Sequence, residues 1–270
     1  MIKRSADKLS ISKQRLKIVD VVRRSGWPGH LSSTMSVLEL LNVLYLEIFS
    51  GKNEIVDKSE NLNSQNDLII LSKGHAALAL YVVLEELGYI TEAQLFTFNN
   101  YGSLLGSHPC RHKVPTVEVN TGSLGHGIPA AVGVAYGFKL SGRSDTVYVI
   151  AGDGEMNEGS NWEAMNTASY VGGLNICLII DLNGDTLKGS NSTCDLFAKS
   201  SSFGWAPRVI NGHCLDEIYK AISESKDGLN VVIANTVKGK GFVAMEQDPE
   251  GWHYRAVTDE EFDRFAVEVL

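Results

Sequence analysis

The chain has 270 residues, of which 44% are hydrophobic and 21% are charged, and this balance excludes extensive disorder. Its formal net charge of −8 disfavours nonspecific binding to nucleic acid. No apolar run reaches the roughly 20 residues that span a bilayer, and the N-terminus lacks a signal-peptide core, so we expect a cytoplasmic protein without membrane contact.

Apolar periodicity in the first part of the chain predicts three helices and one strand. In chain order these are an amphipathic helix ending near Gly26 and Pro28, a largely buried helix over residues 34–49, a buried strand over residues 67–72, and a helix over residues 75–88. The polar residues 51–66 predict a surface loop. Residues 98–125 lack periodicity, and such a long irregular segment is usually functional in a compact domain.

The rest of the chain alternates between strands and helices. The expected strands are 147–151, 176–181, 207–210 and 230–236, and the expected helices are 128–140, 160–171, 214–224 and a short one from Thr258, where "TDEE" predicts a capping box. Strands that are apolar throughout and alternate with helices predict a mostly parallel sheet with helices on both faces. We therefore expect an α/β fold that forms one domain over residues 1–270.

Oxygen-bearing residues follow two of the predicted strands at matching places. Asp153 follows the strand 147–151, and Asn183 follows the strand 176–181. The carboxyl ends of parallel strands meet at one edge of the sheet, where ligands bind, so the two side chains lie side by side if the strands are neighbours. Gly152 and Gly154 allow the backbone to turn close to a ligand.

Either residue alone is better explained as a turn or capping residue. Their correspondence across one helical crossover favours a binding site instead. The N-terminus of the helix 160–171 would add N–H groups that favour an anion. A carboxylate, an amide oxygen and an anion suit Mg²⁺, which prefers oxygen ligands and often shares them with phosphates. The pattern predicts a metal-bound diphosphate.

Gly152-Asp153-Gly154 followed by Asn183 resembles the diphosphate-binding motif of thiamine diphosphate enzymes, and the surrounding segments resemble the transketolase family over nearly the whole chain. These segments are "GHLSSTMS" with His30, "LSKGHAALALY" with His75, "GSHPCR" with His108, "TGSLGHG" with Gly122 and Leu124, and "TVKGKGFVAMEQDPEGWHYRA" with His253. Their order along the chain is that of the family.

The resemblance implies thiamine diphosphate as cofactor, with Mg²⁺ or a substituting Ca²⁺ or Mn²⁺. Asp153, Asn183 and the main-chain carbonyl of Asp185 would hold the metal. The residues expected to contact the cofactor are His75, Gly122, Leu124, Gly152, Asp153, Gly154, Glu155 and Asn183. Leu124 would touch the thiazolium ring.

The resemblance also implies a catalytic group of four histidines: His30, His75, His108 and His253. Imidazole titrates near neutral pH, so these side chains could bind substrate hydroxyls and carry protons. For the histidines at positions 112 and 213 we expect ordinary surface or core roles, and the role of His126 stays open.

Glu158 and Glu163 match family glutamates near the subunit interface that are thought to link paired active sites. A solvated helix face explains these two residues equally well, and both readings stay open.

Only the first of the family's three domains is represented. The resemblance therefore implies the N-terminal subunit of a split enzyme, active with a C-terminal subunit that carries the pyrimidine-binding domain. Homodimerisation would give a two-plus-two assembly. The implied reaction is transfer of a two-carbon ketol unit from a ketose to an aldose, with sugar phosphates as the expected substrates.

Three other functions are considered. The chain could serve another thiamine diphosphate enzyme, which decarboxylates a 2-oxo acid or acts in specialised biosynthesis. "GHGIPA" at residues 125–130 matches the GxGxxA fingerprint of dinucleotide-dependent oxidoreductases, but no clear strand precedes it. A noncatalytic remnant that only binds a partner is disfavoured, because it has no physical need for a polar cavity.

Overall fold

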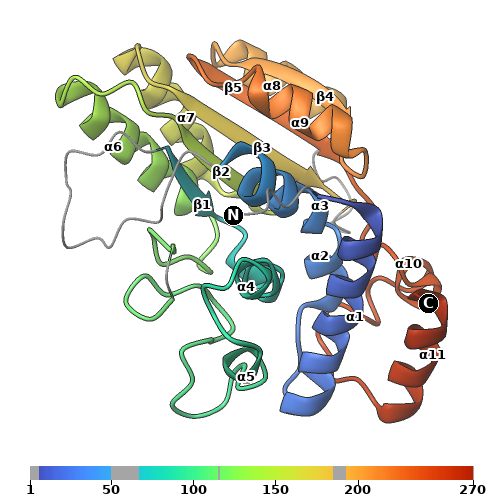
Figure 1. Cartoon of the computed structure of the whole chain (residues 1–270). Coiled ribbons are helices and arrows are strands. Elements are labelled where there is room, and N and C mark those ends of the chain that lie inside the picture. The colour runs from blue at the N-terminus through green and yellow to red at the C-terminus, as the bar shows by residue number, and fades with distance from the viewer. Residues whose placement is uncertain (1–5, 50–66, 115, 185–192, 270) are drawn as a thin grey trace.

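The computed structural model describes residues 6–49, 67–114, 116–184 and 193–269. At its centre is a five-stranded sheet in the order β1-β2-β3-β5-β4, in which every pair of neighbouring strands is parallel (Figure 1). The strands are β1 (Leu68–Leu71), β2 (Val147–Gly152), β3 (Ile176–Leu182), β4 (Ala206–Asn211) and β5 (Leu229–Asn235). The predicted α/β fold is confirmed, and each strand lies close to its predicted range.

Two apolar layers cover the sheet, because successive side chains of a strand point to opposite faces. Tyr148 and Ile150 pack into one layer, and Val149 and Ala151 pack into the other. The first layer is formed with α1 (Lys8–Ser25), α2 (Leu31–Met35), α3 (Leu38–Asn42), the π-helical segment η1 (Val43–Ile48), α4 (Ala77–Glu86) and α9 (Leu215–Ser223). The second is formed with α6 (Gly127–Leu140), α7 (Gly159–Val171) and α8 (Thr193–Ser202).

The N-terminal helices differ from the prediction. The prediction of a single helix over residues 34–49 is wrong. Helix α2 already begins at Leu31, and the helical structure is interrupted at Ser36 before α3 and η1. The hydroxyl of Ser36 is hydrogen-bonded to the main-chain oxygen of Ser33 (3.1 Å) and to the carboxylate of Asp181 (2.7 Å). The break thus places a polar side chain against the end of β3.

Several short elements were not expected from the sequence. They are η2 (Gly74–Ala76), α5 (Glu92–Leu95), η3 (Glu155–Asn157), α8 and α10 (Val243–Gln247). The last helix, α11 (Asp259–Val269), begins at the predicted capping box, in which the main-chain N–H of Glu261 donates to Oγ1 of Thr258 and the N–H of Thr258 donates to Glu261.

The described part of residues 98–125 contains no helix or strand, as predicted. The hydroxyl of the buried Tyr81 anchors this segment by donating to the main-chain oxygens of Gly106 (3.0 Å) and His108 (3.1 Å). The surface loop predicted over residues 51–66 lies outside the described residues. Among the described residues, no helix has both the length and the apolar character needed to cross a bilayer.

Candidate active site

Two oxygen-bearing side chains follow the carboxyl ends of the neighbouring strands β2 and β3. The strands pair with Gly152 opposite Asp181, so Asp153 and Asn183 come next along the same edge of the sheet. The main-chain N–H of Gly184 donates to Oδ2 of Asp153 at 3.0 Å, which joins the end of β3 to the end of β2. The two side chains therefore lie side by side, as the sequence pattern predicts.

The donor atoms at this edge suit a hard divalent cation. Asp153 is 2% exposed, and its two carboxylate oxygens accept from the N–H groups of Gly154 (2.9 Å) and Gly184 (3.0 Å), which fixes the direction of the carboxylate. A Cβ atom at Gly184 would meet no atom within 4 Å, so there is room beside it. Carboxylate and amide oxygens are ligands that Mg²⁺ prefers.

The described residues supply only part of a coordination shell here. The described residues contain no group of three or more His, Cys, Asp and Glu side chains able to hold a metal. Asp185, whose main-chain carbonyl is the third predicted ligand, lies outside the described residues. A cation beside Asp153 and Asn183 would thus take further oxygens from a bound ligand, and Mg²⁺ commonly takes them from phosphates.

The four predicted catalytic histidines meet in one cluster although they come from four separate segments. The ring centroids of His30 and His75 are 4.6 Å apart, those of His75 and His108 are 5.0 Å apart, and those of His30 and His253 are 5.2 Å apart. Their segments precede α2, form η2, belong to the irregular segment and follow α10, respectively. The fold therefore builds a continuous row of imidazoles.

Burial favours the neutral form of three rings of this row, those of His30, His75 and His108. Desolvation, together with the other histidines, lowers the pKa of His30 from 6.5 to about 4. Desolvation also lowers the pKa of His75 and of His108. The Nδ1 atoms of His30 and His253 are buried and have no hydrogen-bond partner within the described residues. Buried polar atoms without a partner are rare in folded proteins, and here they are available to a polar ligand.

The segment with Gly122 and Leu124 packs tightly against the histidine row. Gly122 has φ of +127°, and a Cβ atom there would lie 2.5 Å from the ring of His108. A Cβ atom at Gly74 would lie 2.5 Å from the main-chain nitrogen of Gly122. Side chains at either position would separate the segment from His75 and His108. Leu124, two positions after Gly122, is half-buried.

Glu155 braces the same segment from the other side. Its buried carboxylate accepts from Oγ of Ser72 (2.6 Å) and from the main-chain N–H groups of Gly125 (3.1 Å) and Gly152 (3.4 Å). Burial raises the pKa of Glu155 despite these hydrogen bonds. The structure thus places this predicted cofactor-binding residue between the strand end and the segment with Leu124, with its carboxylate directed at protein atoms.

The two predicted interface glutamates lie at the start of α7 and are exposed. Glu158 is the N-cap residue of this helix, and a Cβ atom at Gly125 would lie 2.7 Å from its Cβ. Glu163 lies further along the helix on its solvent side. His126, whose role is open, is also exposed. In the described chain these side chains are therefore accessible to solvent.

The remaining histidines lie apart from the row. His112 is exposed. His213 accepts from the main-chain N–H of Val237 (2.8 Å), and its Nδ1 lies 3.2 Å from the carboxylate of Glu39. Glu39 also forms a buried ion pair with Arg15 at 2.6 Å. His213 therefore has a structural role, as expected from the sequence.

Sequence reasoning missed a buried ion pair between Lys73 and Asp181. Asp181 is fully buried at the end of β3, and its side chain also accepts from Ser36 (2.7 Å) and Thr236. Burial alone would raise the pKa of Asp181, but Lys73 and the hydroxyl donors outweigh it and hold the pKa below its usual value. No local pattern could have revealed the pair, because its members are 108 positions apart.

An exposed aromatic residue adjoins the histidine row. The ring of Tyr254 lies 4.7 Å from that of His30, and Tyr254 is 53% exposed. Its neighbour Arg255 pairs through its backbone with Gly29, and its guanidinium lies 4.1 Å from the ring centroid of Trp252. The chain around Tyr254 is thereby fixed against the segment that carries His30.

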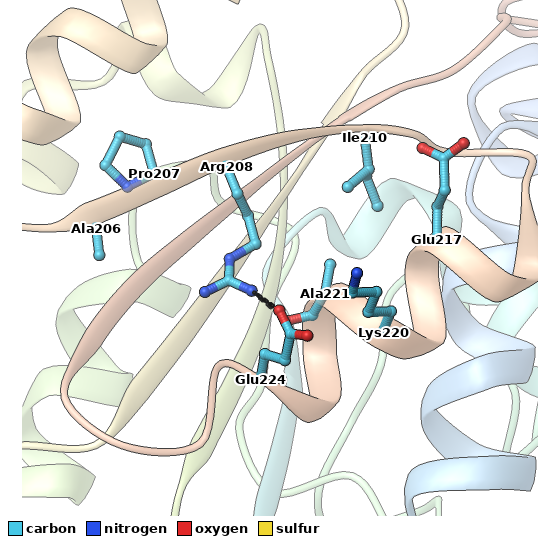
Figure 2. Close-up of a pocket in the computed structure, with 8 residues that line it drawn as sticks. All are labelled: Ala206, Pro207, Arg208, Ile210, Glu217, Lys220, Ala221 and Glu224. Atoms are coloured by element: carbon cyan, nitrogen blue, oxygen red, sulfur yellow. Dashed lines mark hydrogen bonds and ion pairs between the residues drawn. The ribbon is translucent and has the colours of Figure 1, made fainter.

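A groove of about 400 Å³ lies elsewhere, between β4 and α9 (Figure 2). It is open, and an ion pair between Arg208 and Glu224 at 3.0 Å crosses it. None of the predicted site residues lines this groove. The candidate site is therefore the edge of the sheet with the histidine row, and not this groove.

"GHGIPA" does not form a dinucleotide-binding turn. Helix α6 begins at Gly127 within it, and the residues before it belong to the irregular segment instead of a strand. A dinucleotide fingerprint requires a strand immediately before the glycine-rich turn. A Cβ atom at Gly127 would lie 2.4 Å from the side-chain Cβ of Ser72, so this glycine serves close packing.

Comparison with known proteins shows the family of the chain. Residues 6–266 match the family model of the transketolase thiamine diphosphate binding domain. The chain is 38% identical over 262 residues to a subunit of the apulose-4-phosphate transketolase of Actinobacillus succinogenes, covering 95% of this chain and 92% of that protein. It is 36% identical over 258 residues to human transketolase, covering 93% of this chain but only 40% of the human protein.

The fold is also that of solved transketolases. The crystal structure of transketolase from Campylobacter jejuni matches 98% of this chain and 43% of that chain, with a TM-score of 0.83 and 24% identity. The oxidoreductase alternative lacks a fitting turn, and the relatives reported above do not favour it. The chain belongs to the family of transketolase thiamine diphosphate binding domains.

Proposed function

We propose that the chain is the N-terminal subunit of a thiamine-diphosphate-dependent transketolase that transfers a two-carbon ketol unit from a ketose to an aldose. The observation that carries this proposal is the meeting of two features: the strand-end pair Asp153 and Asn183, and the row of four histidines. We propose sugar phosphates as the substrates, since the Actinobacillus succinogenes relative is named for apulose 4-phosphate.

Asp153 and Asn183 would hold Mg²⁺, or Ca²⁺ or Mn²⁺ in its place, against the diphosphate of the cofactor. Asp185 would complete the protein ligands. The bound cofactor supplies the electron sink for breaking and forming the carbon–carbon bond. Gly152 and Gly154 lack side chains, so the backbone at the strand end can lie close to the cofactor. Glu155 would hold the segment with Leu124 in place beside the cofactor.

The histidine row would bind and orient the substrate. A neutral imidazole can donate from one nitrogen and accept at the other, so each ring can bind a sugar hydroxyl and move a proton to or from it. The lowered pKa of His30, to about 4, keeps this ring neutral at physiological pH. The unpartnered Nδ1 atoms of His30 and His253 are the atoms we assign to hydroxyl binding.

We propose that residues 1–270 form a single domain and that a partner chain supplies the pyrimidine-binding and C-terminal domains. One fact supports this: the relative that this chain covers to 92% is named as a subunit. Exposed apolar side chains on α6 and α7 offer a surface for contact between protomers: Tyr136, Leu140 and Tyr170. We expect a two-plus-two assembly, in which Glu158 and Glu163 lie near the interface. A cytoplasmic location stays a prediction.

Complementation tests the proposal. The chain is mixed with the candidate C-terminal subunit, thiamine diphosphate and Mg²⁺, and transfer from a ketose phosphate to an aldose phosphate is measured. Activity should require both chains. Release of CO₂ from pyruvate without ketol transfer would instead indicate the decarboxylating alternative. Full activity of the isolated chain would contradict the proposed division between two subunits.

A further inference from the structure

Asp181 is the centre of a buried polar network that contacts both proposed metal ligands, Asn183 and Asp153. Its carboxylate is paired with Lys73 and accepts hydrogen bonds from the hydroxyls of Ser36 (2.7 Å) and Thr236 and from Nδ2 of Asn183 (3.2 Å). These partners come from four different parts of the chain. Lys73 also donates to the main-chain oxygen of Ser33 at 3.2 Å.

Stability is a poor explanation for this network. Two charges buried in a protein lose their hydration, and apolar residues of similar volume often replace a buried ion pair without loss of stability. The side chains of Lys73 and Asp181 are only 7% and 0% exposed. A buried ion pair at this place therefore points to a role in arranging its neighbours, and the neighbour nearest the proposed metal is Asn183.

The network determines which way the Asn183 amide faces. An ionised carboxylate can only accept hydrogen bonds, so the group that faces Asp181 must be the NH₂ of the amide and not its oxygen. Nδ2 of Asn183 also lies 3.2 Å from Oγ of Ser36. With the NH₂ directed at these two acceptors, the amide oxygen is directed away from them and is free of this network.

The same network ties the strand end to two histidine-bearing segments. Lys73 lies two positions before His75, and Ser36 lies six positions after His30. The main-chain oxygen of Asp181 accepts from the N–H of Asp153 at 3.2 Å, so the residue also contacts the other proposed ligand. One buried carboxylate thus joins both parts of the candidate site.

We propose that Asp181 is a positioning residue, which holds the Asn183 amide with its oxygen toward the cation and aligns the metal-binding edge with the histidine row. This inference rests on the proposed function, because it assumes that the chain binds a metal–diphosphate cofactor. Asp181 itself is buried among protein side chains and acts through Asn183.

The test uses the double variant Asp181→Asn/Lys73→Met, assembled with the partner subunit. It removes both charges and keeps the shape of the side chain at position 181. The new asparagine can offer either a donor or an acceptor to Asn183, so it no longer fixes which way the Asn183 amide faces. The concentration of Mg²⁺ that gives half-maximal binding of thiamine diphosphate is measured by calorimetry. Loss of a group that orients a metal ligand typically weakens metal affinity by about 10- to 100-fold, and we expect at least a tenfold rise.

Two further variants make the result decisive. Arg143→Met/Asp145→Asn removes another ion pair (2.7 Å), just before β2 at the opposite edge of the sheet, and should leave the Mg²⁺ requirement unchanged. Ser36→Ala, which removes no charge, should raise the Mg²⁺ requirement several-fold and serves if the double variant fails to fold.

The outcomes separate the two proposals. If the unmodified assembly binds thiamine diphosphate in a Mg²⁺-dependent way while the Asp181 and Ser36 variants keep its Mg²⁺ requirement and only their melting temperatures fall, Asp181 is merely structural and this inference is wrong. If the unmodified assembly shows no Mg²⁺-dependent binding, the proposed function fails, and this inference fails with it.

Discussion

The strand-end pair and the histidine row differ in how the fold builds them. Asp153 and Asn183 directly follow adjacent strands, so the backbone hydrogen bonds of the sheet set their spacing. The four histidines come from segments outside the strands, and side-chain packing brings them together. The sheet thus constrains the first arrangement. The second depends on supports such as the close contact of Gly122 with His108.

This difference suggests a division of labour. A rigid sheet edge suits an ion and a diphosphate that are bound in one fixed geometry. Loops suit a substrate pocket, because their side chains can vary without altering the sheet. Changes at the strand ends should therefore strongly weaken cofactor binding, whereas changes at His30, His108 and His253 should spare cofactor binding and impair turnover.

The largest effect is expected from Asp153→Asn, which keeps the side-chain shape but removes the charge. We expect the affinity of the assembled enzyme for thiamine diphosphate with Mg²⁺ to fall about 100-fold or more, or roughly 2.8 kcal/mol, as measured by calorimetry. The exposed Asp216 on α9 provides the control, since Asp216→Asn should change nothing. If the two variants bind thiamine diphosphate equally tightly, Asp153 is not a metal ligand.

The next largest effect is expected from His30→Asn. Loss of a proton-transfer group typically lowers the rate about 10²- to 10⁴-fold, and we expect kcat to fall into this range. The affinity for thiamine diphosphate should stay within about threefold of the original, because the strand ends are intact. His112→Asn, at an exposed site, should behave like the unmodified protein. A large loss of cofactor affinity in His30→Asn would contradict the distinction between the strand-end pair and the histidine row.

A smaller effect is expected from Gly122→Ala. The new methyl group would lie 2.5 Å from the His108 ring, at a backbone φ of +127° that side chains rarely adopt. We expect kcat/KM to fall about tenfold, since strain of this kind costs roughly 1–3 kcal/mol. Gly106→Ala in the same irregular segment meets only one atom, at 3.8 Å, and should be near neutral. If both variants behave alike in steady-state kinetics, close packing does not support the histidine row.

The smallest effect concerns stability against pH. The unfolded chain protonates His30 near its ordinary pKa of 6.5, whereas the folded chain keeps this ring neutral down to about pH 4. The folded state should therefore lose stability as pH falls through this window, and the contribution is fully present above 6.5. Thermal melts between pH 7 and pH 4 should show a shallower decline for His30→Asn. An identical decline would contradict the lowered pKa.

Much of the fold could be predicted because it depends on local patterns. The strands β1, β2, β3 and β5 are largely buried apolar runs, and the capping box at Thr258 is a four-residue signal. Short helices such as α5 and α10 were missed, since four or five residues are too few to show a helical period. The helix expected over residues 34–49 was divided because Ser36 contacts Asp181, far away in the sequence.

The candidate site was predictable to different depths. The placement of Asp153 beside Asn183 follows from strand order alone. The meeting of the histidines could be expected only from the family resemblance, because no spacing in the sequence indicates that His30 contacts His253. The pairing of Lys73 with Asp181 has no signal in the sequence at all, since it depends on how the strand ends are packed.

Titration of the assembled subunits with thiamine diphosphate, in the presence of Mg²⁺ and again with a chelator, tests the central claim most directly. Saturable binding that requires the divalent cation and is lost in Asp153→Asn is the predicted result. Binding that is equally tight without a divalent cation, or unaffected by this substitution, would contradict a metal-anchored diphosphate at the ends of β2 and β3.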